Sequence, residues 1–258
     1  MILILLITIL LLSSCGHPKR ARVSVPPPPP PVASTAEPPA AAQPSTSVAA
    51  TTEKSVPAKA EEDADLAEPT IPDGTKPIAT EIGRASWYGP PYHNRRGSNG
   101  EVYNMHAMTA AHRTYPLGSI VRVTNVKTGH SALVRITDRG PFIPGRVLDL
   151  SLAAARKLDV WQPGVAEVKV ELMQASTPLD SGGKWAVQIG GFPDEGVARK
   201  LADHLTRRYR TANVLCFDSP GGDWWIRVRV LEDDHERAQK LAAETTTSEG
   251  AVFLVRLD

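Results

Sequence analysis

The stretch RITDRGPF, residues 135–142, ends a strand-like pattern in a carboxylate. Side chains alternate across a strand, so Ala132, Val134 and Ile136 lie on the same face as Asp138, and the carboxylate continues an apolar row. A carboxyl group at the edge of a core loses hydration, which favours a carboxylic acid that keeps its proton near neutral pH. Because a Gly and a Pro follow, Asp138 also fits a residue that only caps a turn. This stretch by itself leaves both interpretations open.

A second carboxylate, Glu101, follows an Asn-Gly pair that would project it from a loop. It is either a partner for the first carboxylate or a solvated loop residue. Together with Glu101, the histidines His93, His106 and His112 raise the question of a metal site. No pair of them has the i, i+4 spacing of a helical site and none has a Cys partner, so the sequence predicts no metal and no cofactor.

These candidate residues lie in a segment of short alternating runs, residues 82–173. SIVRVTN and SALVRIT have strand patterns and are joined by the turn VKTGH, and RVLDLS and AEVKVEL follow. Between the last two, SLAAARKL predicts a short helix with Ser151 as its N-cap. Because open layers would need more chain for so many strands, we expect a small closed β-barrel with one or two short helices.

A second module follows the breaker STPLDSGG and covers residues 182–258. It contains an internal repeat: WAVQIGGF is followed by VARKLADHL, and WIRVRVLE is followed by RAQKLAAE. With the strands ANVLCF and AVFLVRL the pattern is β-α-β twice, which predicts a four-stranded sheet with both helices on one face and the other face free to bind a ligand. The first helix is expected to turn one stripe toward the sheet, formed by Val197, Leu201, Leu205 and Tyr209.

The N-terminal third has the composition of a targeting and spacer segment. Residues 1–14 are an apolar export signal, too short for a spanning helix, and they end in a sequence that resembles the lipobox of bacterial lipoproteins, so Cys15 is predicted to be lipidated. Residues 15–80 are rich in Pro and Ala and are predicted to be a disordered spacer. Cys216 is then a lone thiol, expected to be an inert core residue. The formal net charge of +1 gives no sign of a nucleic-acid partner.

Several motifs of the middle segment together resemble the rare lipoprotein A family: ASWYG, NGEVYNMHAMTAAH, LGSIVRVTN, VRITDRGPF and RVLDLS, in that order. The C-terminal repeat resembles a SPOR domain, the module that binds peptide-free glycan strands. The resemblance implies a six-stranded double-psi β-barrel followed by a split βαβ SPOR domain with a four-stranded antiparallel sheet and two helices, after a disordered linker.

The family resemblance also implies an activity, endolytic peptidoglycan lytic transglycosylation, in which the muramyl 6-hydroxyl attacks its own anomeric carbon and leaves a 1,6-anhydro product. The implied acid and base is Asp138, which would do both jobs in turn, with Glu101 across the groove to stabilise positive charge on the sugar. His112 either hydrogen-bonds an active-site carboxylate or is structural. Implied sugar contacts are Trp87, Tyr88 and Asn99, although aromatic residues in a small barrel are also core residues.

In the SPOR module the resemblance implies glycan contacts by Gln188, Phe192, Trp225 and Arg227, with Trp224 an alternative to Trp225. The implied partners are glycan strands without stem peptides and, through the lipid on Cys15, the periplasmic face of the outer membrane at the division septum. Amidases and divisome proteins would be indirect partners. Two rival interpretations stay open: a non-catalytic glycan-binding lipoprotein with an expansin-like barrel, and a hydrolase that uses both carboxylates.

Overall fold

A computed structural model describes residues 67–90, 92–179, 182–219, 221–247 and 249–258. The predicted export signal, the predicted lipidated Cys15 and most of the predicted spacer lie outside these residues. All of the described residues belong to one compact unit of the chain. No helix among them is both long enough and apolar enough to cross a membrane.

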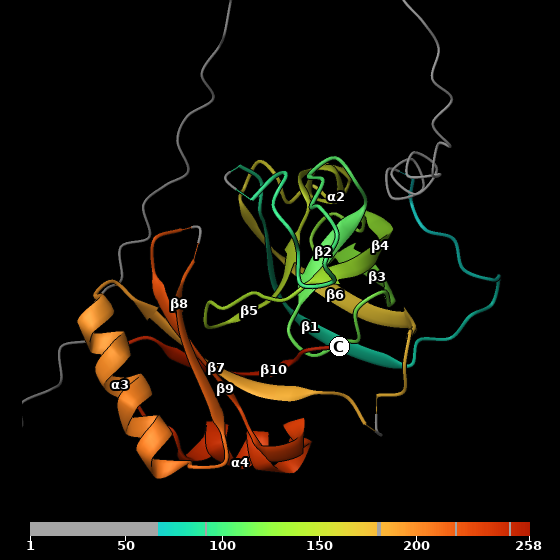
Figure 1. Cartoon of the computed structure of the whole chain (residues 1–258). Coiled ribbons are helices and arrows are strands. Elements are labelled where there is room, and N and C mark those ends of the chain that lie inside the picture. Colours follow the sequence, from blue (N-terminus) through green and yellow to red (C-terminus); the bar gives the residue numbers. More distant parts are fainter. Residues whose placement is uncertain (1–66, 91, 180–181, 220, 248) are drawn as a thin grey trace, which may run out of the picture. The chain divides into compact units, whose positions relative to one another are not determined.

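The first module is a closed barrel of six strands, in the order β1-β5-β2-β4-β3-β6 (Figure 1). This confirms the barrel that the alternating runs predict, although its first strand begins at Ala79, before the predicted boundary at 82. Strand β1 pairs in parallel with β5 and antiparallel with β6, and β2 pairs in parallel with β4 and antiparallel with β5. The elements are β1 (Ala79–Trp87), β2 (Thr109–His112), β3 (Ile120–Asn125), β4 (Ser131–Asp138), β5 (Arg146–Leu150), α2 (Leu152–Lys157) and β6 (Val165–Gln174).

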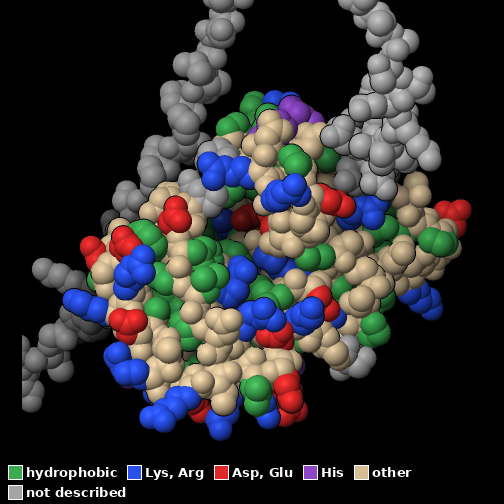
Figure 2. Space-filling view, in the orientation of Figure 1, with side chains coloured by type: hydrophobic (Ala, Val, Ile, Leu, Met, Phe, Trp, Pro, Cys, Tyr) green, Lys and Arg blue, Asp and Glu red, His purple; other side chains and the backbone are tan. Residues whose placement is uncertain are grey.

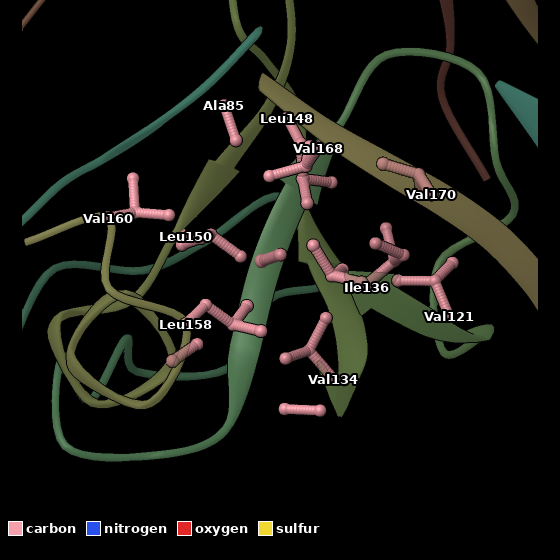
Figure 3. Close-up of a cluster of buried hydrophobic side chains, with 14 of the residues drawn as sticks. Ala85, Val121, Val134, Ile136, Leu148, Leu150, Leu158, Val160, Val168 and Val170 are labelled. Carbon is pink, nitrogen blue, oxygen red and sulfur yellow. The ribbon is translucent and has the colours of Figure 1, made fainter. Parts of the chain in front are cut away.

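Aliphatic side chains fill the barrel interior (Figure 3). Val121, Val134, Ile136, Leu148 and Leu150 are fully buried, as the alternation along their strands predicts. Removing one such side chain from water stabilises the fold by roughly 1.5–3 kcal/mol. The apolar row beneath Asp138 is therefore part of the core that fixes strand β4.

Helix α2 begins as predicted, with Ser151 as its N-cap. The Ser151 hydroxyl accepts a hydrogen bond from the Ala154 N–H at 3.1 Å and donates one to the carbonyl of Ala107 at 2.6 Å. The Ser151 N–H donates to the carbonyl of Thr109 at 2.9 Å. One buried serine thus joins the helix to the start of β2 and to the loop that precedes it.

The second module is a four-stranded antiparallel sheet in the order β10-β7-β9-β8, with α3 and α4 packed on one face (Figure 1). This confirms the duplicated β-α-β arrangement. The two long helices begin at aspartate N-caps, Asp194 and Asp234, whose side chains accept main-chain N–H groups of the first turn. The elements are β7 (Trp185–Phe192), α3 (Glu195–Arg208), β8 (Asn213–Asp218), β9 (Trp224–Arg229), η1 (Leu231–Asp233), α4 (His235–Glu244) and β10 (Ala251–Arg256).

The predicted stripe on α3 is partly wrong. The buried residues of the helix are Ala198, Ala202 and Leu205, whereas Val197 is 36% exposed. Leu201 and Tyr209 of the predicted stripe are partly buried and pack against the same core as Leu205, so only Val197 departs from the prediction. Cys216 is half-buried on β8 and packs against this core, so the prediction of a fully buried thiol is also only partly right.

Candidate functional site

Asp138 ends strand β4 in a half-buried position beside a break in the ladder. Ile136 pairs with Ala110 of β2 and Asp138 pairs with Ala111, so Thr137 is an extra residue between them. The surroundings of Asp138 differ from the expected apolar edge. Its Oδ1 accepts three hydrogen bonds: from the Ser98 N–H at 2.9 Å, from the Ser98 hydroxyl at 2.5 Å and from the Arg139 N–H at 2.7 Å. These donors fix the position of Oδ1.

The loop before β2 folds back over Asp138. A bridge between Arg96 and Val102 closes it into a short hairpin, and Gly100 occupies a positive φ of 88° at its tip. Asn99 bonds Glu101 at both ends: its side-chain oxygen accepts the Glu101 N–H at 3.0 Å, and its amide donates to Glu101 Oε2 at 2.5 Å. The hairpin therefore holds the Glu101 carboxylate in a defined position although that side chain is exposed.

Both carboxylates line one recess of about 30 Å³, room for about one water molecule. The structure thus brings together three of the residues predicted to form the site, Asp138, Glu101 and Asn99. It adds Thr109, whose buried hydroxyl has no hydrogen-bond partner among the described residues. The other residues of the lining are Gly97, Val102, Tyr103, Asn104, Ala107 and Thr137.

Of the two predicted aromatic contacts, Trp87 packs against the barrel core, and Tyr88 stacks on the ring of Tyr103 with the centroids 4.3 Å apart. The Tyr103 hydroxyl donates to the carbonyl of Tyr88 at 2.7 Å. Burial and then the negative charge of Asp138 raise the pKa of both tyrosines, so both stay protonated. Tyr103 lines the recess, and these rings support it from beneath.

His112 does not contact Asp138 or Glu101. Its Nε2 lies 2.6 Å from Glu81 Oε1, and its Nδ1 accepts the N–H groups of Thr114 and Tyr115. The acceptor role of Nδ1 puts the proton on Nε2, which donates to Glu81. Burial is the main cause of a lowered His112 pKa, and the neutral imidazole fits this arrangement. The hydrogen bond expected with an active-site carboxylate is made instead with a residue of β1.

His112 still touches the site indirectly, through Arg139. The Arg139 guanidinium donates to the carbonyls of His112 at 3.0 Å and Tyr115 at 2.6 Å. Since the Arg139 N–H binds Asp138, this buried arginine joins the end of β2 to the catalytic candidate. The only sign of Arg139 in the sequence is its position next to Asp138, and this position does not distinguish a buried arginine from a solvated one.

Asp149 on β5 is a third carboxylate near the site, and its contacts are those of a structural residue. It flanks Ala111 on the side opposite Asp138, accepts the Ser86 hydroxyl at 2.6 Å and lies 3.3 Å from Arg146 Nη2. Burial raises the pKa of Asp149, and the charge of Arg146 and the Ser86 hydrogen bond offset only part of that effect. Its hydrogen bonds agree with the structural role.

The predicted SPOR contacts divide between the two faces of the sheet. Gln188, Trp225 and Arg227 lie on the face without helices, and Arg227 donates two hydrogen bonds to Gln188 Oε1, at 2.8 and 3.2 Å. Phe192 is 1% exposed in the core, so no ring face is left for a sugar. Trp224 packs toward α3, under Arg199, which separates it from Trp225.

The face without helices is partly covered by the barrel. The ring of Phe142, which follows the turn after Asp138, lies 5.5 Å from Trp225 and 5.8 Å from Phe253, centroid to centroid. Gln188 and Trp225 are accordingly only 3% and 8% exposed. In this arrangement a glycan reaches Trp225 only if Phe142 moves.

Charges of both signs are mixed over the face seen in Figure 2. Among the described residues no three His, Cys, Asp or Glu side chains are grouped so that they could hold a metal ion. His93 accepts the Met105 N–H, and its ring lies edge-on to that of His106. Of the three histidines that were considered as metal ligands, His93 and His106 therefore contact each other, whereas His112 contacts Glu81.

Comparisons with known proteins agree with this architecture. Residues 80–170 match a family model described as lytic transglycolase, and residues 181–253 match a model of the SPOR domain. Proteins named endolytic peptidoglycan transglycosylase RlpA are 38% identical over 160 residues in Helicobacter pylori J99, 52% over 99 residues in Vibrio cholerae and 47% over 164 residues in Pseudomonas aeruginosa UCBPP-PA14. The matched parts cover 51%, 38% and 63% of this chain, and the chain spans 51%, 38% and 48% of the length of these relatives.

The barrel, the paired carboxylates and the repeated sheet define a two-module protein, a double-psi β-barrel joined to a SPOR domain. In this pair of modules and in its sequence the chain is similar to the proteins named RlpA, the rare lipoprotein A family.

Proposed function

We propose that this protein is an endolytic lytic transglycosylase that cleaves the β-1,4 bond between N-acetylmuramic acid and N-acetylglucosamine. The observation that supports it best is the recess in which Asp138 and Glu101 meet, with Asn99 fixing Glu101. Relatives that carry the name endolytic peptidoglycan transglycosylase support the same reaction.

In the proposed reaction Asp138 exchanges protons through Oδ2, which has no hydrogen-bond partner among the described residues, while three donors hold Oδ1. The protonated Oδ2 gives its proton to the leaving glycosidic oxygen as the bond from that oxygen to the muramyl C1 breaks. The 6-hydroxyl oxygen then bonds to C1, and its proton passes to the Asp138 carboxylate, which restores the acid. The Glu101 carboxylate stabilises the positive charge on the sugar ring.

The SPOR domain would deliver this barrel to glycan strands that lack stem peptides. Lipidation of Cys15, outside the described residues, would attach the protein to the periplasmic face of the outer membrane, and enrichment at the septum would couple cleavage to the separation of daughter cells. Labelling with radioactive palmitate, lost in Cys15→Ala, tests the anchor. Fractionation of the two membranes tests its location.

The reaction is tested by mass spectrometry of soluble products released from peptide-free glycan strands. Full-length protein with Cys15→Ala is compared with the same protein carrying Asp138→Asn or Glu101→Gln, and Glu167→Gln, an exposed carboxylate on β6, is the matched control. We expect anhydromuramyl ends from the parent and the control, and a loss of at least a hundredfold in Asp138→Asn. Reducing ends from the parent would instead identify a hydrolase.

A second candidate function, glycan binding without cleavage, is favoured by the small size of the recess. A volume of about 30 Å³ does not admit a sugar ring unless the hairpin over Asp138 opens. If the protein only binds glycan, the same incubation releases neither anhydromuramyl nor reducing ends, while the protein still sediments with the glycan.

A further inference from the structure

A second cavity lies beside the candidate active site, at the junction of the barrel and the SPOR sheet. Its volume is about 350 Å³, within the range of small-ligand pockets. It adjoins the catalytic candidate through Ser98, which lines it and donates both of its hydrogen bonds to Asp138. The lining, which we call the arginine pocket, consists of Ser98, Arg139, Asn213, Leu215, Arg227, Arg229 and Leu257.

Three guanidinium groups line the arginine pocket, and two of them have no acidic side chain as a partner. Arg227 binds the neutral amide of Gln188 and stacks over the ring of Phe217. Arg139 donates to the main-chain carbonyls of His112 and Tyr115 and to the main-chain oxygen of Asp258, the last at 2.5 Å, and its Nε is buried with no hydrogen-bond partner among the described residues. In the same part of the chain neither forms an ion pair with a side-chain carboxylate, whereas Arg229 is paired with Asp233 at 2.9 Å.

The acidic groups around these cations compensate them only in part. Burial lowers the pKa of Arg139 to about 10; the charge of Asp258 and, less strongly, that of Asp138 oppose this effect, and repulsion from Arg256 and Arg227 adds to it. Burial and then repulsion from Arg229 also lower the pKa of Arg227, and Asp138 opposes them. A buried cluster of like charges with an unpaired donor is best compensated by an anion.

The substrate of the proposed function supplies one anion close to the cleaved bond. Each N-acetylmuramic acid carries a lactyl group on its 3-oxygen. In a peptide-free strand that group ends in a free carboxylate, whereas in a peptide-bearing strand the same carbon is an amide. Carboxylates are the groups that the planar guanidinium fork binds in a bidentate way.

We propose that the arginine pocket binds the free lactyl carboxylate of a muramyl residue adjacent to the cleaved bond. Arg139 from the barrel and Arg227 from the SPOR sheet would hold the carboxylate together, so the two modules form one site that recognises the missing peptide. This inference rests on the proposed function for its substrate. In this proposal, both the junction of the modules and the SPOR face itself select peptide-free glycan.

The test uses two substrates that differ in charge and hardly in size. Peptide-free glycan strands are compared with the same strands whose lactyl carboxylates have been converted to methylamides with carbodiimide and methylamine. Dissociation constants are measured for full-length Asp138→Asn protein, which cannot turn the strands over, and KM values for the parent. We expect both to be about tenfold or more lower for the carboxylate strands, as for other charge-assisted hydrogen bonds.

Arg227→Gln is then expected to reduce that preference to about twofold or less, whereas Arg208→Gln, an exposed arginine on α3, keeps it. Equal affinity of the unsubstituted pocket for the two strands would overturn the proposal, and this comparison needs no variant of the pocket. A preference that persists in folded Arg227→Gln would overturn it as well. If the parent releases no product but still binds carboxylate strands preferentially, the transglycosylase function fails and the pocket stands.

Discussion

Ser98 donates both its main-chain N–H, at 2.9 Å, and its hydroxyl, at 2.5 Å, to one oxygen of Asp138, forty residues away in the sequence. The hairpin and the end of β4 are therefore a single unit. One oxygen of the carboxylate is fixed, and the other, Oδ2, has no hydrogen-bond partner among the described residues.

The first prediction concerns that hydroxyl. Ser98→Ala removes the shorter of the two bonds and keeps the main-chain one, so we expect kcat/KM on glycan strands to fall by about ten- to a hundredfold, as for the loss of a hydrogen bond to a charged group. Ser98→Thr keeps a hydroxyl and should retain most of the activity. Thermal unfolding should be unchanged, because Ser98 is exposed. Equal activity of Ser98→Ala and the parent would contradict the role of the hairpin.

The second prediction concerns the buried pair of His112 and Glu81. The pKa of His112 is lowered below its ordinary value of 6.5, so the unfolded chain takes up a proton at a higher pH than the folded one. Stability from this group is present above pH 6.5 and is lost as the pH falls through that value. Burial raises the pKa of Glu81 and the His112 hydrogen bond lowers it, and the net shift is downward. Titration of Glu81 therefore changes the stability only below pH 4.5.

Urea unfolding at pH 7.5 and pH 5.5 tests the His112 effect. The parent should exceed His112→Gln in unfolding free energy at pH 7.5, and the gap should narrow at pH 5.5. A gap that stays constant would mean that His112 does not titrate differently in the two states.

The third prediction, for Asp149, has the opposite sign. Burial raises the pKa of this carboxyl above its ordinary 3.8, so the folded state holds the proton to higher pH than the unfolded state does. Its favourable contribution is present below pH 3.8 and is lost as the pH rises through the folded pKa. Relative to Asp149→Asn, the parent should therefore be more stable at pH 4 than at pH 7, as measured by urea unfolding of both proteins. A relative stability that increases with pH would refute the assignment.

The fourth prediction separates strain from steric overlap in the SPOR domain. Gly250 and Gly222 both have positive φ, 78° and 90°. A Cβ at Gly250 would lie 2.4 Å from the carbonyl oxygen of Gly190, whereas one at Gly222 meets nothing within 4 Å. Gly222→Ala should cost about 1–2 kcal/mol from backbone strain alone. We expect Gly250→Ala to cost clearly more, as measured by denaturant unfolding followed by tryptophan fluorescence, and equal costs would argue against the close approach of β10 to β7.

The strands and helices could be predicted because their signals are local. The alternation of apolar and polar residues predicts which side of β4 is buried, and Ser151 as an N-cap predicts the start of α2. The predicted stripe on α3 is right for Leu201, Leu205 and Tyr209 and wrong for Val197. The buried alanines of the helix are not predicted, because spacing alone does not show which small residues face the sheet. For His112 the sequence leaves two roles open and does not reveal its partner, because Glu81 lies on a strand that only barrel closure brings near it.

Only part of the candidate site can be predicted from the sequence. Asp138 and Glu101 have patterns that can be recognised, a strand end and a turn. The roles of Ser98 and Arg139 depend on contacts with residues distant in sequence. Ser98 binds Asp138, forty residues later, and Arg139 in the barrel binds Asp258, at the end of the SPOR module. The arginine pocket could not be predicted at all, because its cations come from segments whose separate environments give no hint that they meet.

The closure of the barrel sets a condition on the order of events during synthesis. Strand β1 is held on one side by β5 and on the other by β6, and Ala79 pairs with Leu172, at the far end of the module. A nascent chain therefore offers its first strand no stable neighbour until nearly the whole module has emerged. Contacts this distant in sequence slow folding, so the barrel stays unfolded for longer than a module whose first strand pairs with its neighbour in sequence.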